Sequence, residues 1–179
     1  GAGYYGQATT ERIFAETDPH GHGFLAEVCR RWEDAAGNFE RSGIRTVKIR
    51  SAVVLEKNDA AMKRLMMSTK AGFLARIGKG EQYMPWIHVA DLCRIYLKAV
   101  SDQKMSGTFN AVSPHHVTHR EFMAALAAVS GKYLLPFNIP PLMLKLVLGE
   151  MSGVILRGSR ISPEILSYLI NLIKDKYRV

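Results

Sequence analysis

The chain has 179 residues, of which 47% are hydrophobic and 22% are charged. This composition is typical of a globular domain with its own core, and it excludes collagen-like, coiled-coil and intrinsically disordered chains. The 24 lysines and arginines outnumber the 16 aspartates and glutamates, for a formal net charge of +8. Because these basic residues form no dense run among aromatic residues, a solvated basic surface is favoured over a nucleic-acid interface.

The two cysteines, Cys29 and Cys93, lie far apart and each falls within a predicted helix. This spacing predicts neither a disulfide framework nor a metal site, and it is typical of a reducing compartment. With no signal-peptide pattern and no apolar run of membrane-spanning length, we expect a cytoplasmic protein without membrane contact. The opening residues 1–6 contain no initiator methionine and suggest a piece of a longer chain.

The first part of the chain predicts a helix, a strand and a second helix. Apolar residues at helical spacing predict a helix over residues 24–36, with its end loosened by Gly37. The β-branched run 46–55 predicts a strand, and its apolar end indicates burial on both faces, as in a parallel sheet. Asn58 or Asp59 can cap the second helix, which we expect to continue to Gly78.

The second part predicts two more strands and several helices. A short strand before Pro85 is followed by a helix to about residue 100, and residues 108–112 form another strand. Thr118 caps a helix over residues 119–129, with Glu121 in its first turn. Prolines at helix-start positions predict two further helices, at residues 140–148 and 163–173.

This order of elements predicts an α/β fold. It indicates part of a Rossmann-like doubly wound parallel sheet in residues 1–133, followed by a C-terminal helical substrate-side cap in residues 134–179. The glycine-rich turn that binds phosphate in a Rossmann fold does not occur in this sequence.

Several segments, in order, resemble one protein family. They are residues 3–6, Glu16-x-Asp18-Pro19, residues 24–33, residues 49–55, Gly80-x-Gln82-x-x-Pro85-Trp86-Ile87-His88-x-x-Asp91-Leu92, residues 107–114 and residues 148–151. Together they resemble atypical extended short-chain dehydrogenase/reductases, and more narrowly the nucleoside-diphosphate-sugar epimerase-like "epimerase family" proteins. The resemblance implies a longer parent that binds NADP or NAD mainly through its N-terminal half.

The resemblance also identifies where catalytic residues would stand. In the wider superfamily a Tyr-x-x-x-Lys pair drives hydride transfer, because the ammonium and the nicotinamide charge lower the pKa of the tyrosine. The matching positions here are Phe24 and Val28, so the usual pair is replaced. Tyr4, Tyr5 and His88 are the remaining catalytic candidates.

Cofactor and substrate contacts can be assigned to particular residues. The predicted cofactor-binding residues are Tyr5, Phe24, Ala52 and Val53, and the predicted substrate-binding residues are Arg50, Gln82, Trp86, His88 and Asp91. Arg50 can bind a phosphate or carboxylate, or it can form a salt bridge at a helix end. His88 can act as a base beside Asp91, or the two can organise the start of a helix.

Met84 stands where nucleotide-sugar epimerases usually have an arginine that grips the diphosphate, which counts against a nucleotide-sugar substrate. His115, His116 and His119 lack a carboxylate or thiol pattern for a metal, so we expect a wet loop cluster and no metal site. Cys29 has no base partner in the sequence, which favours a buried, inert thiol.

Three functions remain open. The leading interpretation is the C-terminal portion of an NAD(P)-binding epimerase or oxidoreductase that acts on an unidentified small molecule, with homodimerisation undecided. The alternative is a non-catalytic cofactor-sensing or interaction module that keeps the fold but has lost the Tyr-Lys pair. The weakest is a basic nucleic-acid-binding domain.

Overall fold

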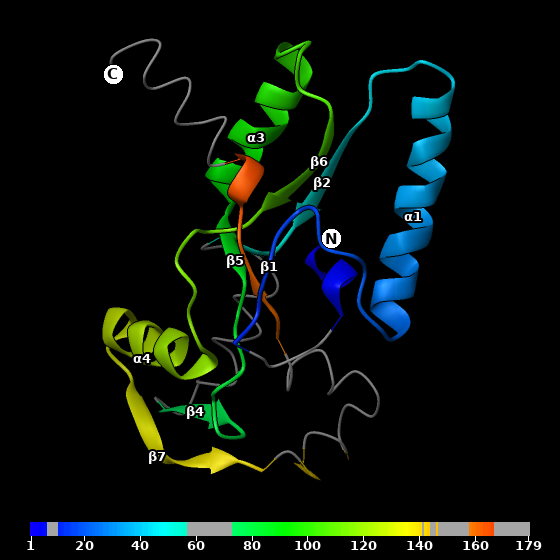
Figure 1. Ribbon diagram of the computed structural model, residues 1–179. Helices are drawn as coiled ribbons and strands as arrows, with labels where there is room; N and C mark the ends of the chain where they lie inside the picture. Colours follow the sequence, from blue (N-terminus) through cyan, green and yellow to red (C-terminus); the bar gives the residue numbers. More distant parts are fainter. Residues whose placement is uncertain (7–10, 57–72, 141, 144–145, 147–157, 167–179) are drawn as a thin grey trace.

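The chain forms parallel strand pairs with helices beside them (Figure 1). The computed structural model describes residues 1–6, 11–56, 73–140, 142–143, 146 and 158–166. In chain order the elements are η1 (Ala2–Tyr5), β1 (Ile13–Phe14), α1 (Phe24–Arg41), β2 (Val47–Ser51), β3 (Val53–Leu55), β4 (Phe73–Ile77), β5 (Trp86–His88), α3 (Val89–Ser101), β6 (Gly107–Ala111), α4 (His119–Ser130), β7 (Tyr133–Ile139) and β8 (Arg160–Ile161). The pairs β1–β8, β2–β6, β3–β5 and β4–β7 are all parallel. Parallel pairing was predicted, although the strands β1, β4, β7 and β8 were not.

Residues 47–55 join two of these strand pairs. Strand β2 pairs with β6 up to Ser51 beside Ala111, and β3 pairs with β5 over three residues. Between them, the Ala52 N–H donates to the Ala111 carbonyl at 3.1 Å, so the backbone changes partner without a loop. The predicted strand is therefore present, with a change of partner at Ala52.

The main core lies between α3 and the strands β5 and β6. Helix α3 follows β5 directly and buries two residues at helical spacing, Ile95 and Ala99. They pack with Ile87 of β5, Phe109 of β6 and Met105 from the turn between α3 and β6. Because fully burying such an aliphatic or aromatic side chain contributes about 1.5–3 kcal/mol, this cluster is a main source of stability for the parallel sheet. The predicted helix to about residue 100 and the predicted strand near 108–112 are both confirmed.

Helix α1 stands beside β2 and packs on η1 (Figure 1). Its buried face includes Ala26 and Cys29, so the expected burial of this thiol is confirmed. The helix continues past Gly37 to Arg41, which is a turn further than predicted. The Ser42 N–H then bonds the Asn38 carbonyl, which closes the last turn.

Helix α4 and the pair β4–β7 form a second packed unit at the other end of the molecule from α1 (Figure 1). Its core includes Leu74, Met123 and Ala127, which are all buried. The predicted cap at Thr118 is confirmed as a capping box: the hydroxyl oxygen accepts from the Glu121 N–H, and the Glu121 carboxylate accepts from the Thr118 N–H. Both groups satisfy N–H donors that the first helical turn leaves free.

Two predictions for the middle of the chain were wrong. Residues 73–77 are strand β4, where the sequence predicted the end of a helix; the start of that helix, in residues 57–72, lies outside the described residues. The short segment 73–77, apolar except for Arg76, fits either a helix or a strand pattern, and its pairing with β7 decides for the strand. The short strand expected before Pro85 lies after it, as β5, and pairs with β3.

The C-terminal region also differs from its prediction. Strand β8 lies within the segment 134–179, which was expected to be a helical cap, and β7 begins one residue before that segment and continues into it. Strand β7 accommodates Pro136 because its register against β4 shifts between Leu74 and Arg76, where a missing N–H costs no ladder bond. A helical turn at residues 164–166 follows Pro163 as predicted. In the described ranges, no helix combines the length and the apolarity needed to cross a bilayer.

The capping box generates a first prediction. Replacement Thr118→Ala removes the hydroxyl that accepts from the first turn of α4, and we expect the free energy of unfolding to fall by about 1 kcal/mol. Urea unfolding monitored by circular dichroism measures the change. Thr118→Ser keeps the hydroxyl and should retain most of the stability; equal losses in the two variants would show that the cap contributes nothing.

Candidate functional site

A buried polar cluster connects η1, α1, β2 and β6 near the carboxyl end of the sheet. The Arg50 guanidinium donates through Nε and Nη2 to both carboxylate oxygens of Glu33, each at 2.8 Å. Its Nη1 donates to the Tyr5 hydroxyl at 2.7 Å and to the Glu16 carbonyl at 3.2 Å. The Tyr5 hydroxyl in turn donates to Asn110 Oδ1 at 2.8 Å.

These bonds occupy Arg50 with protein partners. Its side chain is only 5% exposed and that of Glu33 17%, so the pair is largely removed from water. Burial alone would lower the pKa of Arg50, but the hydrogen bonds and charge of Glu33 and Tyr5 raise it above its ordinary value. Of the two roles that the sequence left open, the arrangement favours the salt bridge, and a role in substrate binding stays a prediction.

The two tyrosines considered for catalysis are held in this cluster. Tyr5 is 1% exposed, and burial raises its pKa above the ordinary value of 10.0, although Arg50 offsets part of the rise. The Tyr4 ring lies under Arg50, with the guanidinium carbon 3.5 Å from the ring centroid, a cation–π contact. A tyrosine with a raised pKa is a poor general base near neutral pH, so this environment disfavours Tyr5 in that role.

A cavity of about 580 Å³, here called the Ala52 cavity, opens at the carboxyl end of β2. Of the predicted site residues, Ala52, Val53 and Gln82 line it. The other lining residues come from η1, α1, α4 and the segments before β5 and β8, among them Gly3, Leu25, Cys29, Met84, His119, Phe122 and Ser159. Ligands of doubly wound sheets bind at this edge of the fold, and the volume suits a small organic molecule.

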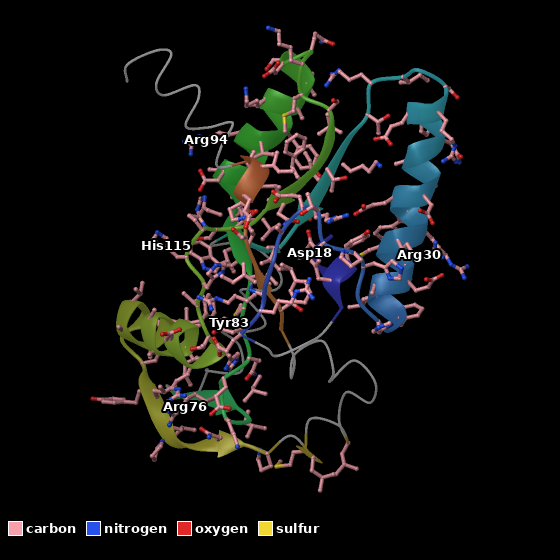
Figure 2. All side chains as sticks on the ribbon, in the orientation of Figure 1. Asp18, Arg30, Arg76, Tyr83, Arg94 and His115 are labelled. Atoms are coloured by element: carbon pink, nitrogen blue, oxygen red, sulfur yellow. The ribbon has the colours of Figure 1, made fainter. Side chains whose placement is uncertain are left out.

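His119 corrects a prediction. The sequence grouped it with His115 and His116 as a wet loop cluster, but it is the first residue of α4 and is 6% exposed. His115 is exposed and lies in the connection between β6 and α4 (Figure 2). The signal for burial was present, because His119 stands four and eight residues before Met123 and Ala127 on one helix face.

A second cavity, here called the His88 cavity, is also about 580 Å³ and is lined by Trp86, His88 and Asp91 together with Arg94 and Lys98 of α3. His88 caps α3: its Nδ1 accepts from the Ala90 N–H at 3.1 Å. Asp91 pairs with Arg94 at 2.7 Å, on the side of α3 away from α1 (Figure 2). Within the described residues no hydrogen bond joins His88 to Asp91, so the organising role at the helix start is the one observed.

The predicted site residues are thus divided. Ala52, Val53 and Gln82 meet at one cavity, and Trp86, His88 and Asp91 at another. Phe24 begins α1 and is 81% exposed. The contribution that sequence reasoning missed is the α4 wall of the Ala52 cavity, provided by His119, Phe122 and Met123. Among the described residues, no group of three histidine, cysteine, aspartate or glutamate side chains is placed to hold a metal ion.

The comparisons with known proteins agree with this architecture. An "Epimerase family protein" of Mycobacterium leprae is 35% identical over 162 residues, which is 90% of this chain and 52% of that protein. The crystal structure of human epimerase family protein SDR39U1 (isoform 2) with NADPH is 28% identical and superposes with a TM-score of 0.81, covering 92% of this chain and 55% of that one. A nucleoside-diphosphate sugar epimerase from Corynebacterium glutamicum is 27% identical, with a TM-score of 0.72 over 94% of this chain and 32% of that one.

The resemblance seen in the sequence motifs, to epimerase family proteins, is therefore confirmed, as is the Rossmann-like parallel fold. The chain spans about half the length of the curated relatives it matches. No family model matches it.

The buried ion pair generates a second prediction. Arg50→Leu leaves the Glu33 carboxylate and the Tyr5 hydroxyl without their shared donor, so we expect a loss of about 3–5 kcal/mol in the free energy of unfolding. Arg94→Leu breaks an exposed pair on α3 and should cost less than about 1 kcal/mol. Urea unfolding of both variants measures the difference; equal effects would contradict a structural role for Arg50.

A third prediction concerns pH. Burial lowers the pKa of His119 below its ordinary 6.5 in the folded protein. As pH falls below 6.5, this histidine is therefore protonated in the unfolded chain before it is protonated in the folded protein. Stability due to the neutral ring is complete above pH 6.5 and is lost as pH falls through the lower folded pKa, by at most about 1.4 kcal/mol per pH unit. We expect His119→Leu to flatten the fall of unfolding free energy between pH 7 and 5. His115→Leu is the control, and unchanged slopes in both variants would contradict the prediction.

Proposed function

We propose, from its similarity to epimerase family proteins, that this chain forms the substrate side of an NAD(P)-binding protein that acts on a small molecule. The observation that supports this most is the Ala52 cavity. It lies at the carboxyl end of a parallel strand, where doubly wound sheets bind their ligands, and Ala52 and Val53 are part of its wall. The related human protein whose structure was solved with NADPH has the same fold over 92% of this chain.

The cavity residues fit the nicotinamide end of such a cofactor. The small side chain of Ala52 and the glycines at positions 1 and 3 leave room for a flat ring, and the apolar side chain of Leu25 can pack against it. The phosphates would be bound elsewhere, because no lysine or arginine side chain lines this cavity among the described residues. When bound, the nicotinamide would supply hydride transfer to or from the substrate.

The proton transfers of such a reaction would need a group other than the usual pair. Phe24 and Val28 have no titratable atom, and Tyr5 is held by Arg50 and Asn110 with its pKa raised by burial. Among the described lining residues of the Ala52 cavity, His119 carries the imidazole, the side-chain group whose ordinary pKa lies nearest to neutral, and burial lowers its pKa below that ordinary value. We therefore assign any proton transfer to His119 ahead of the tyrosines.

The second candidate function is a cofactor sensor without catalysis. It is favoured by the replaced pair and by the use of Tyr4, Tyr5 and Arg50 in a structural cluster. A reduced cofactor that binds but stays reduced with every carbonyl substrate tried would support the sensor. Loss of NADPH absorbance with one of them would support the enzyme. A homodimer stays an open possibility, a cytoplasmic location stays a prediction, and nucleic-acid binding stays the weakest alternative.

A fourth prediction tests the cofactor site. Ala52→Leu places three more carbon atoms in the Ala52 cavity, and we expect NADPH affinity of the full-length protein to fall at least about 10-fold, because overpacking at a ligand wall costs about 1–3 kcal/mol. Isothermal titration calorimetry measures the change. The matched control is Ala125→Leu on the exposed face of α4, which should bind as the unmodified protein does. Absence of NADPH binding before any substitution would refute the proposed function.

A further inference from the structure

The described lining of the Ala52 cavity carries no carboxylate, ammonium or guanidinium side chain. Met84, Phe122 and Met123 make much of its wall apolar. A diphosphate entering this space would lose its hydration with no counter-charge to replace it. The cavity therefore disfavours the anionic half of a nucleotide sugar and favours an uncharged molecule.

Most polar side chains of the wall are already bonded. The Tyr83 hydroxyl lies 3.2 Å from a carboxylate oxygen of Glu11, outside the cavity, and the Ser159 hydroxyl donates to the Gly6 carbonyl at 3.0 Å. Gln82 donates from Nε2 to the Ile77 carbonyl at 3.3 Å. Tyr83 itself lies near the start of α4, as Figure 2 shows.

His119 is the exception. The ring is more than nine-tenths buried, Nδ1 is enclosed without a hydrogen-bond partner, and in the described part of the chain no group bonds to the imidazole. Because Nδ1 is closed off, only Nε2 can reach a ligand. Enclosed N–H donors without partners are rarer than enclosed acceptors, so the favoured neutral form has its proton on Nε2.

We propose that the Ala52 cavity binds an uncharged, mainly apolar molecule with a carbonyl oxygen, and that His119 donates a hydrogen bond from Nε2 to that oxygen. This proposal rests on the proposed function, because it names the substrate class of the same site. A carbonyl compound is also a chemical partner for a hydride-transferring cofactor. With this bond Nε2 has a hydrogen-bond partner on the ligand, while Nδ1 stays the enclosed acceptor.

The test uses two probes of nearly the same shape on the full-length protein. Acetophenone has the carbonyl oxygen, and α-methylstyrene has a methylene group in its place. Their dissociation constants are measured by ligand-observed NMR in the unmodified protein, in His119→Leu and in the control His116→Leu, whose ring does not line the cavity. We expect His119→Leu to weaken acetophenone by roughly 3- to 10-fold and to leave α-methylstyrene and the control unchanged.

A second measurement requires no variant. With ¹⁵N-labelled histidine, acetophenone should shift the Nε2 resonance of His119, and α-methylstyrene should not. An unshifted resonance, equal weakening of both probes, or displacement of acetophenone by UDP-glucose at lower concentration would overturn the proposal.

The two proposals fail separately. Displacement of acetophenone by NADPH would assign the cavity to the cofactor alone, which overturns the carbonyl-substrate proposal and keeps the proposed function. Acetophenone binding through His119 in a protein that does not bind NADPH would overturn the proposed function and keep the assignment of the cavity to a carbonyl compound.

Discussion

The bidentate bond between Arg50 and Glu33 is the interaction on which the arrangement of the sheet and its flanking helix most depends. It joins β2 to α1, and through Tyr5 and Asn110 it extends to η1 and β6. The carboxylate of Glu16 continues the cluster by accepting from the Asn110 N–H at 3.1 Å. Buried charges are tolerated only when geometry and hydrogen bonding compensate for lost hydration, so these residues have little freedom to move for a ligand.

Contacts of this kind, between residues far apart in the sequence, separate the features that the sequence could predict from those that it could not. Elements with a clear period or cap were predictable: α3, β6 and α4 follow from their apolar spacing and from the Thr118–Glu121 cap. Strands β4 and β7 were missed because each is stable only against the other, and pairing between residues 60 positions apart leaves no local pattern. Arg50 is a parallel case, because a buried arginine and a ligand-binding arginine look the same until the position of Glu33 is known.

The candidate site shows the same limit. Ala52, Val53 and Gln82 were identified through family resemblance, and they do line one cavity. Trp86, His88 and Asp91 are close to Gln82 in sequence but line another cavity, because they lie on β5, which pairs with β3, and on the helix that follows it. His119 is the first residue of α4, and its hydrogen bonding depends on the residues that the fold places around it. Sequence spacing cannot show whether any described neighbour bonds to the ring.

The change of partner at Ala52 has a consequence for how this site can evolve. Backbone bonds to Ala111 and to Pro85 fix the two ends of this junction, and neither involves a side chain. Wall residues that are only half-buried, such as Leu25 and Phe122, take no part in this junction, so exchanging them leaves its backbone bonds in place. A change of ligand at this site therefore requires no change in the backbone bonds that join the two strand pairs.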